Sequence, residues 1–225
     1  GITSATTYHT GNSGIIRNNP SKVAVDINHN RWIATDTGLS VFKGNKWDSV
    51  FVFKDVDQKN QKFADFPITD IASFNPDSQA FITTAGKGVA RYKYKPVDGF
   101  TGASAYGLPW SQISTDNFRA VSIKDELQWY ATDNGALKHT SFLTKDNWTI
   151  YNTDSGLLNN NVQAVFIHPD NNNIWFGTSQ GLSVFTGKDW YYYTENEGLI
   201  SNVINHITSD MKGNVWIATP QGIEW

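Results

Sequence analysis

The feature that most constrains the fold of this chain is a tryptophan-anchored motif that recurs along its whole length. The motif reads Trp32-Ile33-Ala34-Thr35 and returns at Trp129, Trp175 and Trp216, each time followed by a turn and a glycine. A degenerate copy at Phe81 completes a set of five, whose anchors are 49, 48, 46 and 41 residues apart. Repetition at this period indicates stacked units, such as the blades of a β-propeller or the coils of a solenoid.

Each repeat predicts four short antiparallel strands. Apolar residues three apart, such as Val162 and Val165, mark a first strand, and a polar turn like that at residues 210–214 follows. Asn, Asp and Gly suit a tight hairpin because they tolerate positive φ. The anchor opens a second strand, the glycine leads into a third, and Trp148 or Trp190 begins a fourth. Because helical periodicity is not sustained, the pattern favours propeller blades over a helical solenoid.

The two ends of the sequence predict how the ring closes. The fifth repeat stops at Trp225 inside its third strand, and residues 6–10 resemble a fourth strand with no repeat before them. We therefore expect residues 2–10 to complete the last blade, which leaves no long unpaired edge. The predicted fold is all-β: a five-bladed β-propeller with four antiparallel strands per blade in a single domain, 1–225, with blade units near 11–53, 54–100, 101–153, 154–196, and 197–225 plus 2–10.

Composition excludes several classes of protein and partner. Aromatic residues make up 14% and charged residues 17%, which is typical of a β-rich protein because aromatic side chains suit pleated, half-buried surfaces. The net charge of −3 and the lack of a basic run disfavour nucleic acid as a partner. No apolar run is long enough to predict a membrane-spanning segment. The absence of cysteine excludes a disulfide scaffold and a thiolate metal site, and we expect no cofactor.

The repeat resembles the two-component-regulator propeller repeat of bacterial sensors. The pattern G-L-x-x-N-x-V, followed by D-x-x-G-N-x-W-x-[GA]-T-x-x-G-L, is best kept over residues 156–182 and 198–223. The second repeat lacks the tryptophan, and the third inserts residues before Asp116. The resemblance implies a periplasmic or extracellular setting and a role in sensing glycans. Sensors of this kind usually carry more blades and continue into a membrane helix and a kinase, which this sequence does not contain.

One position of the repeat, just before the first strand of each blade, is a candidate ligand site. Alignment of the repeats places Asn18, Phe66, Asp116, Asn160 and Asn202 at this position, and a closed ring would gather them at one mouth of its channel. Amide groups both donate and accept hydrogen bonds, which suits a hydroxyl-rich ligand. The alternative is that these amides bond main-chain groups and shape their loops.

Two insertions add loops to this candidate site, at residues 54–65 and 106–115. Loops on a rigid scaffold often carry specificity. In the second insertion, Tyr106 and Trp110 lie outside the packing repeat, so we expect their rings to stack on the ligand; the alternative is that Trp110 covers a blade edge. The anchor tryptophans are instead interpreted as packing residues between blades, because they repeat at an interior strand position.

The sequence favours a binding module over an enzyme. Asp36 and Asp133 occupy one repeated turn position, so they do not suggest the paired carboxylates of a glycosidase. The histidines lack metal-ligand spacing, and His168 is expected to be a solvated turn residue. We predict a non-enzymatic, exported and monomeric propeller that binds a glycan or another small polar ligand. The alternatives are a structural or protein–protein interaction propeller and, less favoured, a five-bladed glycosidase or lyase.

Overall fold

The computed structural model describes residues 5–26, 28–54, 60–65, 67–74, 79–86, 88–95, 99–105, 117–140 and 148–225. In this part of the chain the regular structure is β-strand, apart from two single-turn 3-10 helices, η1 (Thr153–Ser155) and η2 (Glu195–Glu197). Neither helix approaches the length and apolar character needed to cross a bilayer. The all-β prediction is therefore confirmed.

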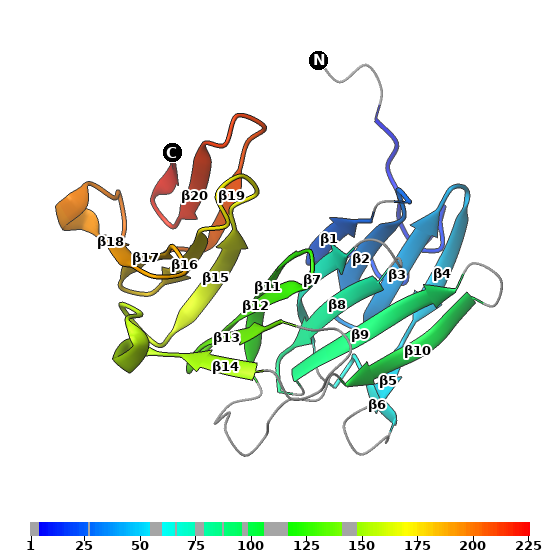
Figure 1. Ribbon diagram of the computed structural model, residues 1–225. Coiled ribbons are helices and arrows are strands. Elements are labelled where there is room, and N and C mark those ends of the chain that lie inside the picture. Colours follow the sequence, from blue (N-terminus) through cyan, green and yellow to red (C-terminus); the bar gives the residue numbers. More distant parts are fainter. Residues whose placement is uncertain are drawn as a thin grey trace.

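The described strands form five sheets that follow one another along the chain (Figure 1). Sheet 1 contains β1 (Lys22–Val25), β2 (Arg31–Thr35), β3 (Gly38–Lys43) and β4 (Lys46–Val50). Sheet 2 contains β5 (Val52–Lys54), β6 (Asn60–Lys62), β7 (Ile68–Phe74), β8 (Gln79–Thr84), β9 (Gly88–Lys95) and β10 (Gly99–Ala105). Sheet 3 contains β11 (Phe118–Lys124), β12 (Leu127–Thr132), β13 (Gly135–His139) and β14 (Trp148–Tyr151). Sheet 4 contains β15 (Val162–Ile167), β16 (Ile174–Thr178), β17 (Gly181–Phe185) and β18 (Trp190–Tyr193), and sheet 5 contains β19 (His206–Ser209), β20 (Val215–Thr219) and β21 (Gly222–Glu224).

Sheet 2 differs from the predicted four strands. The insertion at residues 54–65 was expected to be a loop, but strands β5 and β6 form a hairpin around its first half. Strand β5 then pairs in parallel with β10, so the hairpin extends the outer edge of the sheet to the order β6-β5-β10-β9-β8-β7. The remaining pairs in this sheet and the others are antiparallel.

The repeated T-x-x-G motif forms the hairpin between the second and third strands of a sheet. In sheet 4 the Thr178 hydroxyl donates a hydrogen bond to the carbonyl of Gly181 at 2.7 Å, and the same bond recurs in sheets 1, 3 and 5. Gly181 has φ +125°, where side chains are strained, and a β-carbon there would lie 2.6 Å from the Tyr193 carbonyl oxygen. The geometry of this hairpin therefore accounts for both the threonine and the glycine of the motif.

The core lies between successive sheets, with an anchor tryptophan at each of two interfaces. Trp32 and Trp129 are almost fully buried. The Trp129 ring contacts Tyr151 of its own sheet at 4.8 Å between centroids and Phe176 of sheet 4 at 5.1 Å. These contacts confirm the packing role of these two anchors, whereas Trp216 is 38% exposed.

Hydrogen bonds link the innermost strands of neighbouring sheets. Asp70 of β7 accepts from the N–H of Val121 on β11 at 3.0 Å. Ser122 of β11 accepts from the N–H of Ile167 on β15, also at 3.0 Å. Sheets 2, 3 and 4 are thus joined side by side through their innermost strands.

The predicted closing strand is not found among the described residues. Strand β21 pairs only with β20, and residues 5–18 form no strand. Figure 1 shows sheets 1 and 5 at opposite ends of the series of sheets, with the N-terminal segment beside sheet 1. The Tyr8 ring contacts Phe42 and Trp47 of sheet 1, at centroid distances of 5.4 and 5.5 Å. The five-bladed ring and its closure by residues 2–10 therefore stay predictions.

Candidate binding site

The predicted asparagines that the structure describes lie in the loops that lead into a sheet's first strand. Each side-chain oxygen accepts a hydrogen bond from an N–H seven or eight residues earlier: Asn18 from Thr10 at 2.8 Å, Asn160 from Thr153 at 2.8 Å, and Asn202 from Glu195 at 2.9 Å. The amide oxygens thus shape their loops, and a ligand role for these side chains stays a prediction. The other predicted site residues, Phe66, Tyr106, Trp110 and Asp116, lie outside the described residues.

The loop between sheets 4 and 5 is held by a capping box around η2. Thr194 donates to the Glu197 carboxylate through its hydroxyl at 2.6 Å and its N–H at 2.9 Å. These two bonds hold the pKa of Glu197 below its ordinary value. Asn202 completes the loop, because its own N–H donates to the Glu195 carboxylate at 3.0 Å. The loop therefore presents Glu197 and the residues after it in a fixed arrangement.

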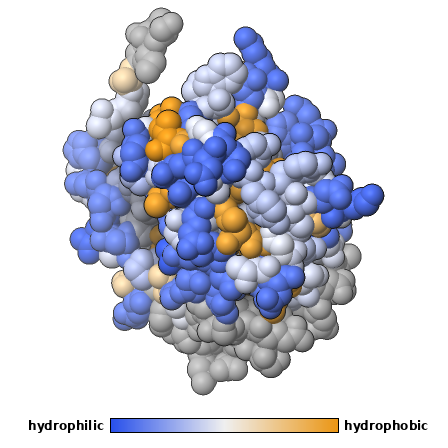
Figure 2. All heavy atoms as spheres, turned by 90° about the vertical axis from the view of Figure 1, so that its left-hand side faces the viewer, coloured by the Kyte–Doolittle hydropathy of each residue, from blue (hydrophilic) through white to orange (hydrophobic). Residues whose placement is uncertain are grey.

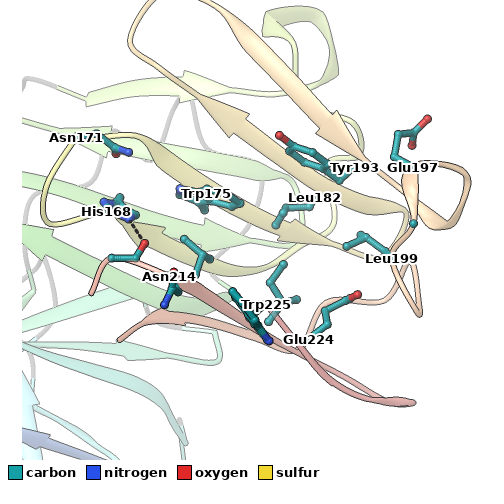
Figure 3. Close-up of a pocket in the computed structure, with 14 residues that line it drawn as sticks. His168, Asn171, Trp175, Leu182, Tyr193, Glu197, Leu199, Asn214, Glu224 and Trp225 are labelled. Carbon is teal, nitrogen blue, oxygen red and sulfur yellow. Dashed lines mark hydrogen bonds between the residues drawn. The ribbon is translucent and has the colours of Figure 1, made fainter. Parts of the chain in front are cut away.

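These residues border a groove of about 590 Å³ between sheets 4 and 5. Figure 3 shows Trp175, Leu182 and Tyr193 along sheet 4 on one side and Glu224 and Trp225 along sheet 5 on the other. The rings of Trp175 and Tyr193 are nearly parallel, at an interplanar angle of 8° and a centroid distance of 6.5 Å. The groove thus combines aromatic walls with a polar border.

The indole N–H of Trp175 is buried and has no hydrogen-bond partner in the described part of the chain. In sheet 1 the equivalent Trp32 donates to the Asp26 carboxylate at 3.1 Å. Sheet 4 has His168 in the corresponding turn, and this buried side chain bonds the Gly213 carbonyl at 3.0 Å instead. The expectation that His168 is solvated was therefore wrong, and its turn leaves the Trp175 donor unpaired.

Glu224 supplies an unpaired acceptor on the other side of the groove. In sheet 4 the equivalent residue is Ser183, whose hydroxyl accepts from the Leu158 N–H at 3.0 Å. Glu224 makes the same kind of bond with one oxygen, accepting from the Ile200 N–H at 3.1 Å. Its other oxygen, Oε1, is buried with no partner among the described residues. The repeat contained this signal, a glutamate in a serine position, but the sequence analysis did not use it.

Gly198 on the groove border has different surroundings from its counterparts in other loops. Trp47 covers Gly14 and Trp190 covers Gly156, so that a β-carbon at either glycine would collide with the tryptophan. Gly198 is the next glycine of this series and has the same φ as Gly156, +111°. A β-carbon at Gly198 would meet no described atom within 4 Å. Gly198 therefore lies at an open part of the groove border, with no described ring over it.

A second group of polar side chains lies on the inner strands. Lys22 of β1 and Asp70 of β7 form an ion pair at 3.6 Å. Burial nevertheless raises the pKa of Asp70 above its ordinary value. Burial, and next the charge of Lys22, lower the pKa of His206 on β19. Three sheets thus contribute titratable groups to one region, but the described residues contain no cluster of three or more metal-ligating side chains.

Two parts of the sequence match a known family model. Residues 156–180 and 198–221 match the model of the two component regulator propeller. These segments are similar to two-component regulator propeller repeats. They span the β15–β16 hairpin and the β19–β20 hairpin, with the loops that form the groove border. No curated protein matches the sequence.

Solved propeller structures resemble the fold. The extracellular domain of a hybrid two-component system from B. thetaiotaomicron matches with a TM-score of 0.69 at 20% identity, over 91% of this chain and 27% of that one. PorZ of Porphyromonas gingivalis, described as a surface component of the type-IX secretion system, matches with a TM-score of 0.69 at 17% identity, over 97% and 34%. Virginiamycin B lyase from Staphylococcus aureus matches with a TM-score of 0.53 at 11% identity, over 92% and 83%.

These likenesses show the fold alone, because the sequences are so different. The chain spans only about a quarter to a third of the length of the first two structures, 27% and 34%.

Proposed function

We propose that this chain is a non-enzymatic propeller module that acts outside the cytoplasm and binds a glycan-like ligand. The regulator repeats and the likeness to an extracellular sensor domain support this setting. Within the proposal the chain is one domain whose five sheets form a closed ring. Sheets on a rigid ring hold loops and grooves in place, which favours binding with little ordering of the protein.

The observation that carries the proposal is the groove between sheets 4 and 5, which combines two nearly parallel aromatic rings with buried polar groups. A sugar ring is flat enough to lie in such a groove. Its apolar face would lie on the Trp175 and Tyr193 rings. Its hydroxyls would accept from Trp175 Nε1 and donate to Glu224 Oε1, two buried atoms of groove-lining residues that have no partner among the described residues.

The predicted site at the loop mouth belongs to the same proposal as a second contact region. Asn202 shapes the loop that also supplies Glu197 and Leu199 to the groove. An extended ligand in the groove would therefore pass close to this loop. A closed ring would bring the other predicted site residues to the same region. These are Asn18, Phe66, Asp116 and Asn160, with Tyr106 and Trp110 on the adjacent insertion.

Binding of a protein partner is the second candidate function. Apolar side chains form an interrupted patch on the side of the molecule that carries sheets 4 and 5 (Figure 2). Ile223 and Trp225 of this region are 70% and 79% exposed. Uncovered apolar groups of this size commonly mark interaction surfaces. The glycan reading is preferred because it also explains the unpaired donor and acceptor.

Glycan-array binding of the purified protein, with paired tyrosine variants, tests the proposal. Tyr193→Ala removes one wall of the groove and should weaken the strongest array signal at least tenfold. Tyr191→Ala is the matched control, since Tyr191 lies on the same strand but is exposed and does not line the groove. No array binding, or equal loss in both variants, would contradict the proposed function.

A further inference from the structure

We propose that a basic pocket between sheet 1 and the β5–β6 hairpin binds the oxyanion of a small organic ligand, such as a carboxylate, sulfate or phosphate group. The pocket has a volume of about 340 Å³. The described residues that line it are Ile16, Arg17, Thr37, Phe51, Lys62 and Ala64. It is separate from the groove between sheets 4 and 5 and would act independently of the proposed glycan ligand.

Arg17 stands at a loop position where two other repeats have a side chain that closes its own loop. In the loop before sheet 4 the residue is Asn159, whose side-chain oxygen accepts from the N–H two residues later at 2.7 Å. In the loop before sheet 5 it is Ser201, whose hydroxyl accepts in the same way at 3.2 Å. A guanidinium group has no acceptor, so Arg17 cannot make this bond. Its side chain is exposed and forms no salt bridge within the described ranges.

Lys62 comes from the insertion that gives sheet 2 its extra hairpin (Figure 1). It ends strand β6 and pairs with Val52 of β5. The next residue, Phe63, is fully buried, and its N–H donates to the Phe51 carbonyl at 3.0 Å. These contacts fix the hairpin beside the end of sheet 1. Lys62 itself is exposed and has no ion-pair partner in the part of the chain that the structure describes.

Ile16 and Phe51 give the pocket apolar walls with a fixed backbone. The Ile16 N–H donates to the Ser40 hydroxyl at 3.0 Å. A β-carbon at Gly38 would lie 3.0 Å from Ile16 Cδ1 and 3.3 Å from Phe51 Cα, so the chain is closely packed behind the pocket. Phe51 is 51% exposed, so a ligand can reach its side chain. Apolar surroundings lower the effective dielectric constant and so strengthen the attraction between a cation and an anion.

Two separate departures from the repeat thus bring positive charge to one pocket. No described residue that lines it is acidic. Asp36 and Asp65 each neighbour a lining residue in the sequence, but neither lines the pocket, and the Asp36 carboxylate accepts from the Asn19 amide at 2.9 Å. The chain as a whole has a net charge of −3, so the charge of this pocket is opposite to that of the protein.

These side chains can hold one oxyanion through several donors. The planar guanidinium of Arg17 can bond two oxygens of one carboxylate, sulfate or phosphate group. Lys62 adds a point charge and Thr37 a hydroxyl. The volume of about 340 Å³ is near the lower end for ligand pockets, about 300–1,000 Å³, and suits a single ring. The groove between sheets 4 and 5 is lined by Glu197 and Glu224 and by no described Lys or Arg, so it disfavours the same ligand.

Titration of the full chain with four related sugars, followed in ¹H–¹⁵N spectra, tests this pocket. Glucuronic acid, glucose 6-sulfate and glucose 6-phosphate carry the three oxyanions on one body, and glucose is the neutral control. At least one of the three anions should shift the amide resonances of Arg17, Thr37 and Lys62 saturably, and glucose should not. Equal shifts with glucose, or no saturable shift with any of the anions at millimolar concentrations, would overturn the proposal.

Charge-neutral variants test which cations bind the anion. Arg17→Gln and Lys62→Gln should each weaken binding of the preferred anion about tenfold, the loss expected for one charge-assisted hydrogen bond. Lys46→Gln is the matched control, because Lys46 is exposed on β4 and does not line the pocket. Unchanged affinity in both pocket variants, or an equal loss in Lys46→Gln, would refute the assignment.

Two controls separate this site from folding and from the groove. Because Arg17 and Lys62 are exposed, both glutamine variants should melt at the wild-type temperature, so a loss of binding reports on the site. Tyr193→Ala should leave anion binding unchanged, since Tyr193 lines the groove and not this pocket. Loss of anion binding in Tyr193→Ala would place the anion in the groove and contradict the proposal. The glycan array with Arg17→Gln should give the wild-type signal, so either proposal can fail alone.

Discussion

Substitution of two equivalent glycines provides a sharp test of how the loops after η1 and η2 are packed. Gly156 and Gly198 each end a single-turn helix with φ +111°. Alanine at this backbone conformation costs roughly 1–2 kcal/mol, and that cost is common to both sites. The sites differ in what covers them. A β-carbon at Gly156 would lie 2.5 Å from Trp190 Nε1, whereas one at Gly198 would meet no described atom within 4 Å.

The difference between the two variants follows from packing. Trp190 cannot move aside, because Phe176 and Phe185 hold its ring. Overpacking of this kind adds about 1–3 kcal/mol. With about 2–4 °C per kcal/mol for a chain of this size, Gly156→Ala should melt about 4–8 °C below Gly198→Ala if the overlap costs about 2 kcal/mol.

Differential scanning calorimetry of the two variants and the wild-type protein measures this difference. The two variants each carry one added methyl group on an equivalent loop, so each serves as the control for the other. Equal melting temperatures for the two variants would refute the reasoning. They would mean that another group covers Gly198 or that the Trp190 ring shifts to make room for the added methyl group.

Four further outcomes are expected. Trp129→Ala should lower the free energy of unfolding by about 3–5 kcal/mol in urea titrations, because it leaves a large cavity between sheets. Asn160→Ala should lower it by about 1 kcal/mol in the same assay, since the Thr153 N–H loses its acceptor. Burial raises the pKa of Asp70 above 3.8, so the wild type should lose stability relative to Asp70→Asn as pH rises through that raised pKa. The pKa of His206 is lowered from 6.5, so the folded state favours its neutral form. This contribution to stability should be present above pH 6.5 and lost as the pH falls through the lowered pKa. It should be absent in His206→Gln.

The fold could be predicted from the sequence where the contacts of a residue recur from one repeat to the next. The T-x-x-G hairpin and the burial of Trp32 and Trp129 are of this kind, because strand pairing and the next sheet are the same in each repeat. The hairpin of β5 and β6 could not be predicted, because it depends on a parallel pairing with the distant β10.

The groove could not be predicted for a related reason. Its two sides come from different repeats, with Trp175 on one and Trp225 on the other, so the pattern of a single repeat does not define it. The polarity of the groove depends on Glu224, which occupies a position that is serine in sheets 1 and 4. The predicted asparagines were located correctly in the loops before the first strands, but their oxygens bond main-chain groups.

The indole N–H resonance of Trp175 gives the most direct measurement of ligand binding in the groove. In two-dimensional ¹H–¹⁵N spectra, titration with the oligosaccharide that binds best on the array should shift this resonance strongly, because the ligand supplies the acceptor that Trp175 Nε1 lacks among the described residues. The Trp129 resonance should stay unchanged, since that ring is buried between sheets 3 and 4. A saturable shift of Trp175 that is lost in Tyr193→Ala is the predicted result. Binding that leaves Trp175 unshifted would contradict the groove as the glycan site.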